Sequence, residues 1–366
     1  MKKTVLLVTI WDNQNFGNRL QAIALKHIIE CEGYDVCCAL SNPFTFYHRV
    51  KILIKELLGC MGLDRYRIYY KKRIRKKTIE KSARDLLFPN TKMISNYKVN
   101  SQIDSNHYML AIVGSDQVWH HWYNNPYELS FFYLQFMPPE KRVSYAASFG
   151  FDEFPVADKD QHILGLSGMR AISCREETGC QLVKNATGKP GTLVLDPTLC
   201  VGKRFWESVE ERVTFVSSRP FMLVFMLGRS ENYRTQIEAY AVEHDLAIID
   251  LFDINNKDVW RVTIGGLLWL IHHAEVICTD SFHCTVFSIL YEKPFLVFKR
   301  LQTGYETMYN RIETLLYLTG LEMRQYNGKS LEFSNIDFMY AKRRIEEARH
   351  ESLEWLSNIL HKVARE

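Results

Sequence analysis

The sequence predicts an α/β protein in which two Rossmann-like domains face each other across a cleft. Short apolar runs such as residues 4–10 and 108–115 alternate with helical patterns, and two such series follow each other along the chain. Apolar strands that alternate with helices are typical of a mostly parallel sheet covered on both faces. The length of 366 residues suits two domains, and 47% hydrophobic with 24% charged residues is a globular composition.

The first domain is predicted over residues 1–215. Its strands are short runs rich in Val, Ile, Leu and Cys, as expected for strands buried on both faces. They are predicted at residues 4–10, 34–40, 108–115, 142–150, 170–176 and 192–197. A helix is predicted at 18–33, where apolar residues recur with helical spacing until Gly33. Residues 44–105 carry few strand signals and are predicted as a basic, helical insertion.

The second domain is predicted over residues 216–334, and its first residues, 216–220, are interpreted as a hinge. Its expected strands are residues 221–227, 246–250, 275–280 and 294–298. Its expected helices are near residues 231–244, 264–273 and 283–291. This second strand–helix–strand series again favours a parallel sheet. The last stretch, 335–366, is predicted as a terminal helix.

The nine cysteines argue against a disulfide framework and a zinc site, because the number is odd and no Cys-x-x-Cys pair occurs. We expect a reducing compartment and no metal. The N-terminal apolar run is too short for a signal peptide. No stretch approaches the roughly 18 apolar residues of a membrane-spanning helix. The expectation is therefore a soluble, cytoplasmic protein.

Residues 65–84 form a basic segment with ten Lys or Arg and a single acid, Glu80. One interpretation is the solvated face of a helix. The other is a basic lid that contacts anionic phosphate or a membrane surface. Nucleic acid is not an expected partner, because the net charge is only +4 and no recognition motif is present.

Two polar segments follow predicted strands of the first domain. Asn15 and Gly17 lie in the loop after the first strand, and Asn18 begins the next helix. Helix N-termini attract anions, and a glycine allows close approach of the backbone. Ser115 and Asp116 follow another buried strand, at the edge where α/β sheets bind ligands, although a plain helix cap would explain them as well.

Three further segments end strands in the same way. Arg175 is placed to bind carboxylate or phosphate, or to pair with a neighbouring glutamate. Asp196 precedes a proline and is interpreted as a structural turn residue. His283 begins a helix after Asp280 and Ser281. A histidine there, with Asp280 as the nearby acid, is suited to proton transfer near neutral pH.

Six segments in order resemble the polysaccharide pyruvyl transferase family. They are NFGNRLQAIAL, VGSDQVW, ISCREETG, VLDPTL, TDSFHCTVFSILYEKPF and NRIETLLYLTGLEMR. The resemblance implies a two-domain GT-B-like fold, in agreement with the two series above. It also implies transfer of a pyruvyl group from phosphoenolpyruvate to two hydroxyls of a sugar in a surface or exported polysaccharide precursor. No cofactor beyond this donor substrate is implied.

The resemblance also implies roles for individual residues. His283 matches the motif histidine and is the expected acid or base, with Asp280 beside it. The expected donor-binding residues are Arg175, Ser281, Gly17, Asn18 and Arg311. The expected residues of the acceptor side or the cleft are Ser115, Asp116 and Asn15. Some family members carry an arginine two residues before the motif histidine, where this chain has Ser281.

The expected partner is a glycan or a lipid-linked sugar acceptor, with peripheral membrane contact through residues 65–84. Two other functions remain open at this point. One is a GT-B-type glycosyltransferase that uses a nucleotide sugar. The other is a non-catalytic glycan-assembly protein.

Overall fold

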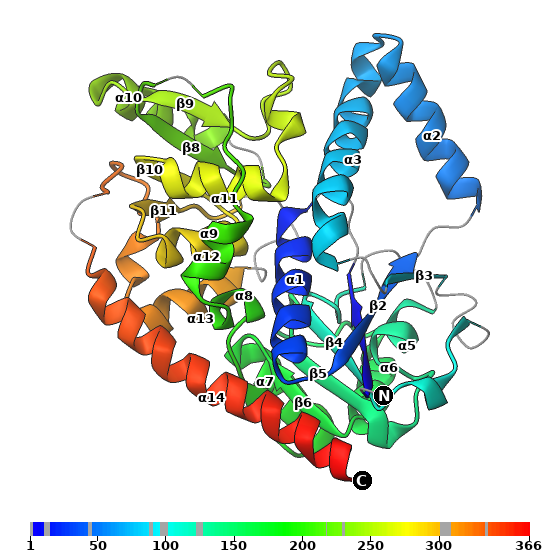
Figure 1. Ribbon diagram of the computed structural model, residues 1–366. Coiled ribbons are helices and arrows are strands. Elements are labelled where there is room, and N and C mark those ends of the chain that lie inside the picture. Colours follow the sequence, from blue (N-terminus) through cyan, green and yellow to red (C-terminus); the bar gives the residue numbers. More distant parts are fainter. Residues whose placement is uncertain are drawn as a thin grey trace.

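A computed structural model describes residues 3–10, 15–42, 46–87, 91–95, 102–121, 127–216, 218–228, 231–300, 309–333 and 336–366. Two parallel sheets with helices packed around them form the body of the molecule (Figure 1). The strands of the larger sheet lie between residues 4 and 193, and those of the smaller sheet lie between residues 221 and 297. The two sheets therefore come from successive parts of the chain.

The larger sheet has seven parallel strands in the order β3-β2-β1-β4-β5-β6-β7. Their bounds are β1 Thr4–Thr9, β2 Asp35–Asn42, β3 Thr91–Ser95, β4 Leu110–Asp116, β5 Arg142–Ala147, β6 Ala171–Cys174 and β7 Thr192–Leu193. Every residue of the central strand β4 is buried. Burial on both faces explains why the central strands are continuous apolar runs without alternation.

Strand β3 corrects one part of the sequence prediction, because it lies inside the segment 44–105 that was expected to be helical. It pairs with β2 from Cys38↔Thr91 to Asn42↔Ser95 and forms one edge of the sheet. Its sequence, TKMIS, is short and mixes polar with apolar residues. Edge strands of this kind are short and charged, so they carry little hydrophobic signal.

The smaller sheet has four parallel strands in the order β11-β10-β8-β9. Their bounds are β8 Phe221–Phe225, β9 Ala247–Asp250, β10 Val276–Thr279 and β11 Phe295–Val297. Helices α10 Arg234–Glu243, α11 Ile264–His273 and α12 Phe282–Leu290 connect these strands. Every residue of α12 is buried, and so the apolar part of the last motif is core.

The other described helices complete the layers. They are α1 Phe16–Cys31, α2 Phe46–Cys60, α3 Arg67–Leu87, α5 Glu128–Phe132, α6 Lys159–Ser167, α7 Glu177–Thr187, α8 Pro197–Cys200, α9 Lys203–Val209, α13 Asn310–Thr319 and α14 Phe338–Arg365. Helix α1 is buried along most of its length and contacts α8, α11 and α12 as well as the first sheet. One apolar cluster runs from Val5 of β1 through Leu223 of β8 to Leu356 of α14. The two sheets thus share a core.

Helices α2 and α3 form a hairpin that projects from the body of the molecule (Figure 1). Arg75 of α3 is buried, with its guanidinium 4.2 Å from the centre of the Trp260 ring and 4.6 Å from that of Phe252. It donates hydrogen bonds to the carbonyl oxygens of Leu251 and Val259. Because Trp260 and Phe252 follow the second β-strand of the smaller sheet, this arginine ties the hairpin to that half of the molecule.

Helix α14 crosses both halves of the molecule (Figure 1). Near its start, Lys342 pairs with Glu292, next to the smaller sheet, at 2.8 Å. At its end, Glu366 pairs with Arg170, next to the larger sheet, at 2.7 Å.

Among the described residues, no helix combines the length and the apolar character that would be needed to span a bilayer.

Candidate functional site

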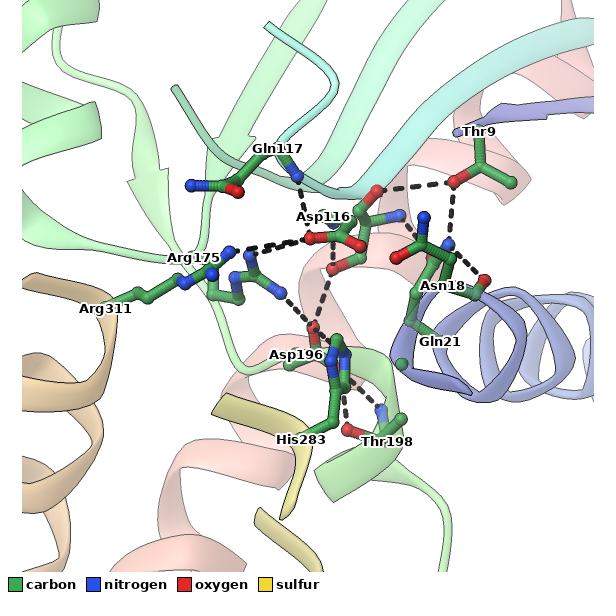
Figure 2. Close-up of polar contacts among 12 residues, drawn as sticks. Thr9, Asn18, Gln21, Asp116, Gln117, Arg175, Asp196, Thr198, His283 and Arg311 are labelled. Atoms are coloured by element: carbon green, nitrogen blue, oxygen red, sulfur yellow. Dashed lines mark hydrogen bonds and ion pairs between the residues drawn. The ribbon is translucent and has the colours of Figure 1, made fainter. Parts of the chain in front are cut away.

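Six polar side chains meet where the carboxyl ends of the strands lie close to the N-termini of α1, α8 and α12 (Figure 2). We call them the polar cluster. It consists of Ser115, Asp116, Arg175, Asp196, His283 and Arg311. All six sit on segments that the sequence places directly after strands or at the starts of helices. The fold therefore brings together residues that are up to 196 positions apart.

Asp196 lies at the centre of the polar cluster and is almost completely buried. Its Oδ2 accepts hydrogen bonds from Arg175 Nη1 at 2.8 Å and from Ser115 Oγ at 2.7 Å. Its Oδ1 accepts from the backbone N–H of Thr198 at 3.0 Å and from its hydroxyl at 2.6 Å, which caps helix α8. The residue interpreted as a turn former is thus the hub of the site.

His283 approaches the same carboxylate from the other half of the molecule. Its Nε2 lies 3.7 Å from Asp196 Oδ2, which is an ion-pair separation rather than a hydrogen bond. The other edge of the imidazole faces Gly17 of α1, where a Cβ atom would overlap Nδ1. Gly17 is required here because any side chain would displace the ring. This contact brings the N-termini of α1 and α12 together.

Two arginines share the second acid of the polar cluster. Arg175 Nη2 lies 3.3 Å and Arg311 Nη1 lies 3.6 Å from Asp116 Oδ1. Both guanidinium groups also face the Phe282 ring, at 4.4 Å and 5.9 Å from its centre. Among the described residues, Arg311 Nε is buried and makes no hydrogen bond. Arg175 is therefore neutralised by two carboxylates, whereas Asp116 is the one described carboxylate within ion-pair distance of Arg311.

The charged groups of the polar cluster strongly shift one another's pKa values. Burial alone would raise the pKa of Asp196, but His283 and Arg175 lower it well below its usual value. The pKa of Asp116 is also lowered, because Arg175, His283 and Arg311 outweigh its burial. Burial, together with repulsion from Arg175, lowers the pKa of Arg311 to about 9. An anion bound beside Arg311 would relieve this penalty.

The first turn of α1 offers further polar groups. Asn15 caps the helix by accepting a hydrogen bond from Gly17 N at 2.9 Å. The side-chain oxygen of Asn18 is buried and has no hydrogen-bond partner among the residues that the structure describes. Gln21 accepts from the backbone N–H of Ser115 at 2.8 Å and donates to Thr9 Oγ1 at 2.7 Å, which fixes this turn against β1 and β4. Thr9 and Gln21 were not among the predicted site residues.

Asp280 has a different place from the one expected. Its carboxylate accepts from the backbone N–H groups of Leu227 and Gly228, both at 2.7 Å, and from Arg300 Nε at 3.1 Å. The acid that pairs with His283 is Asp196, and Asp280 holds the turn after β8 together with Arg300. Side chains of successive residues diverge where a strand ends, so closeness in sequence did not identify the partner.

Ser281 is the N-cap of α12, where its hydroxyl accepts from Cys284 N at 3.4 Å. The nearby cation is Arg300, whose Nη2 donates to the Asp280 carbonyl oxygen at 3.2 Å. Arg300 comes from the segment after β11, so a positive charge reaches the Asp280–Ser281 peptide from a neighbouring strand end.

A cavity of about 240 Å³ opens beside the polar cluster. Arg175, Asp196, Phe282 and Arg311 line the end of it that meets the polar cluster. Aliphatic residues of α13 and β7 line much of the rest, with Arg344 of α14 as a further cation. The cavity thus combines three arginines with an apolar wall and with the carboxylates of Asp196, Glu177 and Glu351.

Among the described residues, Glu210, His272 and His273 form a group whose potential metal-binding atoms all lie within 4.8 Å of one another. Both histidines end α11, directly before β10 begins. The group therefore lies at the amino end of the strands, opposite the polar cluster. It belongs to none of the motifs.

Asp196 could have been found from sequence by a rule already in use. It lies near the carboxyl end of a strand, as Ser115 and Arg175 do, and the carboxyl ends of parallel strands share one edge of the sheet. The proline after Asp196 suggested a structural turn, and so Asp196 was not predicted to be a site residue. The sequence did single out the other five members of the polar cluster.

The sequence profile of the polysaccharide pyruvyl transferase family matches residues 15–300. This range contains all members of the polar cluster except Arg311. No curated protein matches the chain.

Among solved structures, a UDP-N-acetylglucosamine 2-epimerase from Listeria monocytogenes has a TM-score of 0.50 and 10% sequence identity, over 97% of this chain and 91% of that one. The UDP-GlcNAc 2-epimerase of Neisseria meningitidis, bound to UDP-GlcNAc, has a TM-score of 0.49 and 11% identity, over 98% and 100% of the two chains. At such low identity the Listeria likeness shows only the fold, which is GT-B-like. The profile match goes further than the fold: this chain belongs to the polysaccharide pyruvyl transferase family.

Proposed function

We propose that the protein is an enzyme that transfers a pyruvyl group from phosphoenolpyruvate to two hydroxyls of a sugar. The observation that carries the proposal is the contact between His283 and Asp196, beside two buried arginines and two helix N-termini. Family membership supports the reaction class. The geometry supports the role that we assign to each residue below.

The reaction needs a proton donor and a proton acceptor. Protonation of the methylene carbon of phosphoenolpyruvate makes C2 electrophilic, and one sugar hydroxyl adds to C2 as its proton leaves. The C2–O bond to phosphate then breaks, inorganic phosphate leaves, and the second hydroxyl closes the ketal with loss of its proton. We assign proton transfer to His283, because its imidazole lies in the polar cluster with Nε2 3.7 Å from the Asp196 carboxylate.

The donor carries a phosphate and a carboxylate, which require cations and N–H groups. Arg311 is suited to this task because its Nε has no hydrogen-bond partner in the described part of the chain and its pKa is lowered to about 9. The N-termini of α1 and α12 add backbone N–H groups and the positive ends of two helix dipoles. Arg175 is held by Asp116 and Asp196, so we assign it to positioning these acids rather than to the main donor contact.

We also propose that Arg300 supplies the positive charge that, in some family members, comes from an arginine at the position of Ser281. Its guanidinium lies against the Asp280–Ser281 peptide, with Nη2 3.2 Å from the Asp280 carbonyl oxygen.

The proposed acceptor is a glycan or a lipid-linked sugar of a surface polysaccharide precursor, and the proposed location is the cytoplasm. The 240 Å³ cavity gives room for a small ligand beside Arg311, although Glu177 and Glu351 also line it.

The direct test is mass spectrometry of candidate sugar acceptors after incubation with the protein and phosphoenolpyruvate. The expected product is heavier than the acceptor by one pyruvic acid less one water, and phosphate is released in equal amount. A parallel incubation with UDP sugars is the control. Glycosyl transfer with release of UDP, and no product from phosphoenolpyruvate, would overturn the proposal.

Replacing Gly17 with alanine is expected to lower kcat for this transfer by about 10²-fold, because the added methyl group displaces His283 from its position. The measurement is steady-state kinetics, with thermal unfolding as a check on the fold. Gly202→Ala is the matched control, since a Cβ atom there meets nothing within 4 Å. Equal kcat for the two variants would contradict the assigned role of the Gly17–His283 contact.

A further inference from the structure

Helix α2 carries an apolar stripe that no other part of the described chain covers. We define the outer stripe as Phe46, Val50, Leu53, Ile54 and Leu57. These residues follow the spacing i, i+4, i+7, i+8 and i+11, so they lie on one face of the helix. Their exposed fractions are 82%, 38%, 45%, 52% and 50%. Such continuous exposure of large apolar side chains marks an interaction surface.

The opposite face of α2 is the one that packs on α3. Gly59 lies so close to Tyr66 and Tyr70 that a side chain would collide with them. Glu56 pairs with Arg73 at 3.4 Å, and Lys55 Nζ donates to Tyr69 Oη at 3.2 Å. The hairpin is therefore closed on its inner side, and the outer stripe faces away from it.

Basic side chains surround the outer stripe. Arg49 and Lys51 lie within it in sequence, and both are exposed. Between Phe46 and Leu87 the chain has thirteen Lys or Arg and four Asp or Glu. An exposed apolar face bordered by cations is complementary to a bilayer with anionic headgroups.

The expected contact region, residues 65–84, fits this role less well than α2 does. Lys71, Arg75 and Ile79 of α3 are buried, and Arg75 is enclosed by aromatic rings of the other half of the molecule. Helix α3 therefore supports the hairpin from inside. Its exposed cations, such as Lys72 and Lys77, add to the positive potential.

We propose that the outer stripe of α2 inserts into the interface of an anionic lipid bilayer and docks the protein on the membrane surface. The apolar residues enter the boundary between headgroups and acyl chains, and Arg49 and Lys51 bind the headgroups. The inference concerns a surface outside the polar cluster and does not rest on the reaction proposed above.

The experiment is flotation of the full-length protein with vesicles of phosphatidylcholine alone or mixed with phosphatidylglycerol. Wild type is expected to bind the mixed vesicles and to dissociate as salt increases. Leu53→Ser combined with Leu57→Ser is expected to lower the partition coefficient at least about tenfold, because two apolar insertions are lost. The matched control is Val156→Ser combined with Val242→Ser, which removes exposed apolar side chains elsewhere and is expected to bind as wild type.

A second pair tests the charges. Arg49→Glu combined with Lys51→Glu is expected to lower binding to the mixed vesicles about tenfold or more, since each cation contributes about 1 kcal/mol at an anionic surface. Lys159→Glu combined with Lys184→Glu is its control, because both lysines are exposed on the other side of the larger sheet. Circular dichroism shows whether each variant is folded. If Leu53→Ser with Leu57→Ser is not folded, Phe46→Ser with Val50→Ser is used in its place.

Two outcomes would overturn the proposal. One is binding of the Leu53→Ser, Leu57→Ser variant at the wild-type level. The other is no binding of wild type to the mixed vesicles, and light scattering then tests for a dimer that the same variant converts to monomer. Such a dimer would mean that the outer stripe covers another copy of this chain.

Discussion

Replacing His283 with glutamine is expected to lower kcat for pyruvyl transfer by about 10²–10⁴-fold, the usual contribution of a positioned acid or base. Glutamine keeps much of the bulk of the ring against Gly17 but transfers no proton. Asp196 keeps its bonds to Arg175, Ser115 and Thr198, so the stability of the fold is expected to change little.

The measurement is the steady-state rate of ketal formation at saturating substrates, with unfolding by urea followed in parallel. His272→Gln is the matched control, because His272 is also partly buried and paired with an acid, Glu210, but lies at the opposite end of the smaller sheet. Wild-type kcat in the His283 variant would refute the assignment, and loss of kcat in both variants would point to a general defect.

Replacing Asp196 with alanine is expected to destabilise the protein by about 3–5 kcal/mol, because it leaves the buried cation Arg175 without its closest partner. The same change uncaps α8 and removes the acceptor of Ser115. Equilibrium unfolding by urea measures the loss. Asp245→Asn is the control: Asp245 pairs with Arg219 on the surface, where an ion pair contributes at most about 1 kcal/mol.

The pH dependence of the free energy of unfolding distinguishes the contribution of the negative charge of Asp196 from that of its packing. The folded pKa of Asp196 lies below the unfolded value of about 3.9, so the unfolded state binds its proton first as pH falls. The contribution of Asp196 is therefore complete above the unfolded pKa and is lost as pH decreases towards the folded pKa. Asp196→Asn is expected to lack this part of the acid-induced loss. An unchanged profile would show that Asp196 is not ionised in the folded protein.

Most of the fold follows from local patterns in the sequence. Strands such as Leu110–Asp116 are buried on both faces, so their apolar runs stand out, and the helices between them carry periodic apolar residues. Strand β3 was missed because it has only five residues and mixes polar with apolar types, which gives a weak strand signal. The position of α3, with Arg75 enclosed by Phe252 and Trp260, depends on contacts between residues far apart in sequence, which no local pattern reports.

The site follows from the sequence only in part. The rule that strand ends carry ligand-binding residues led to Ser115, Asp116, Arg175 and His283. The pairing among them was not accessible, because it depends on the angle at which the two sheets meet. Asp280 is three residues from His283 yet bonds to Leu227 and Gly228, whereas Asp196, eighty-seven residues away, pairs with the imidazole.

Helix α14 limits how far the two halves of the molecule can separate. It pairs with Glu292 in one half and with Arg170 in the other. Its buried Leu356 belongs to the apolar cluster that both sheets share. A hinge motion that moved His283 away from Asp196 would therefore have to break one of these ion pairs or bend the helix between them.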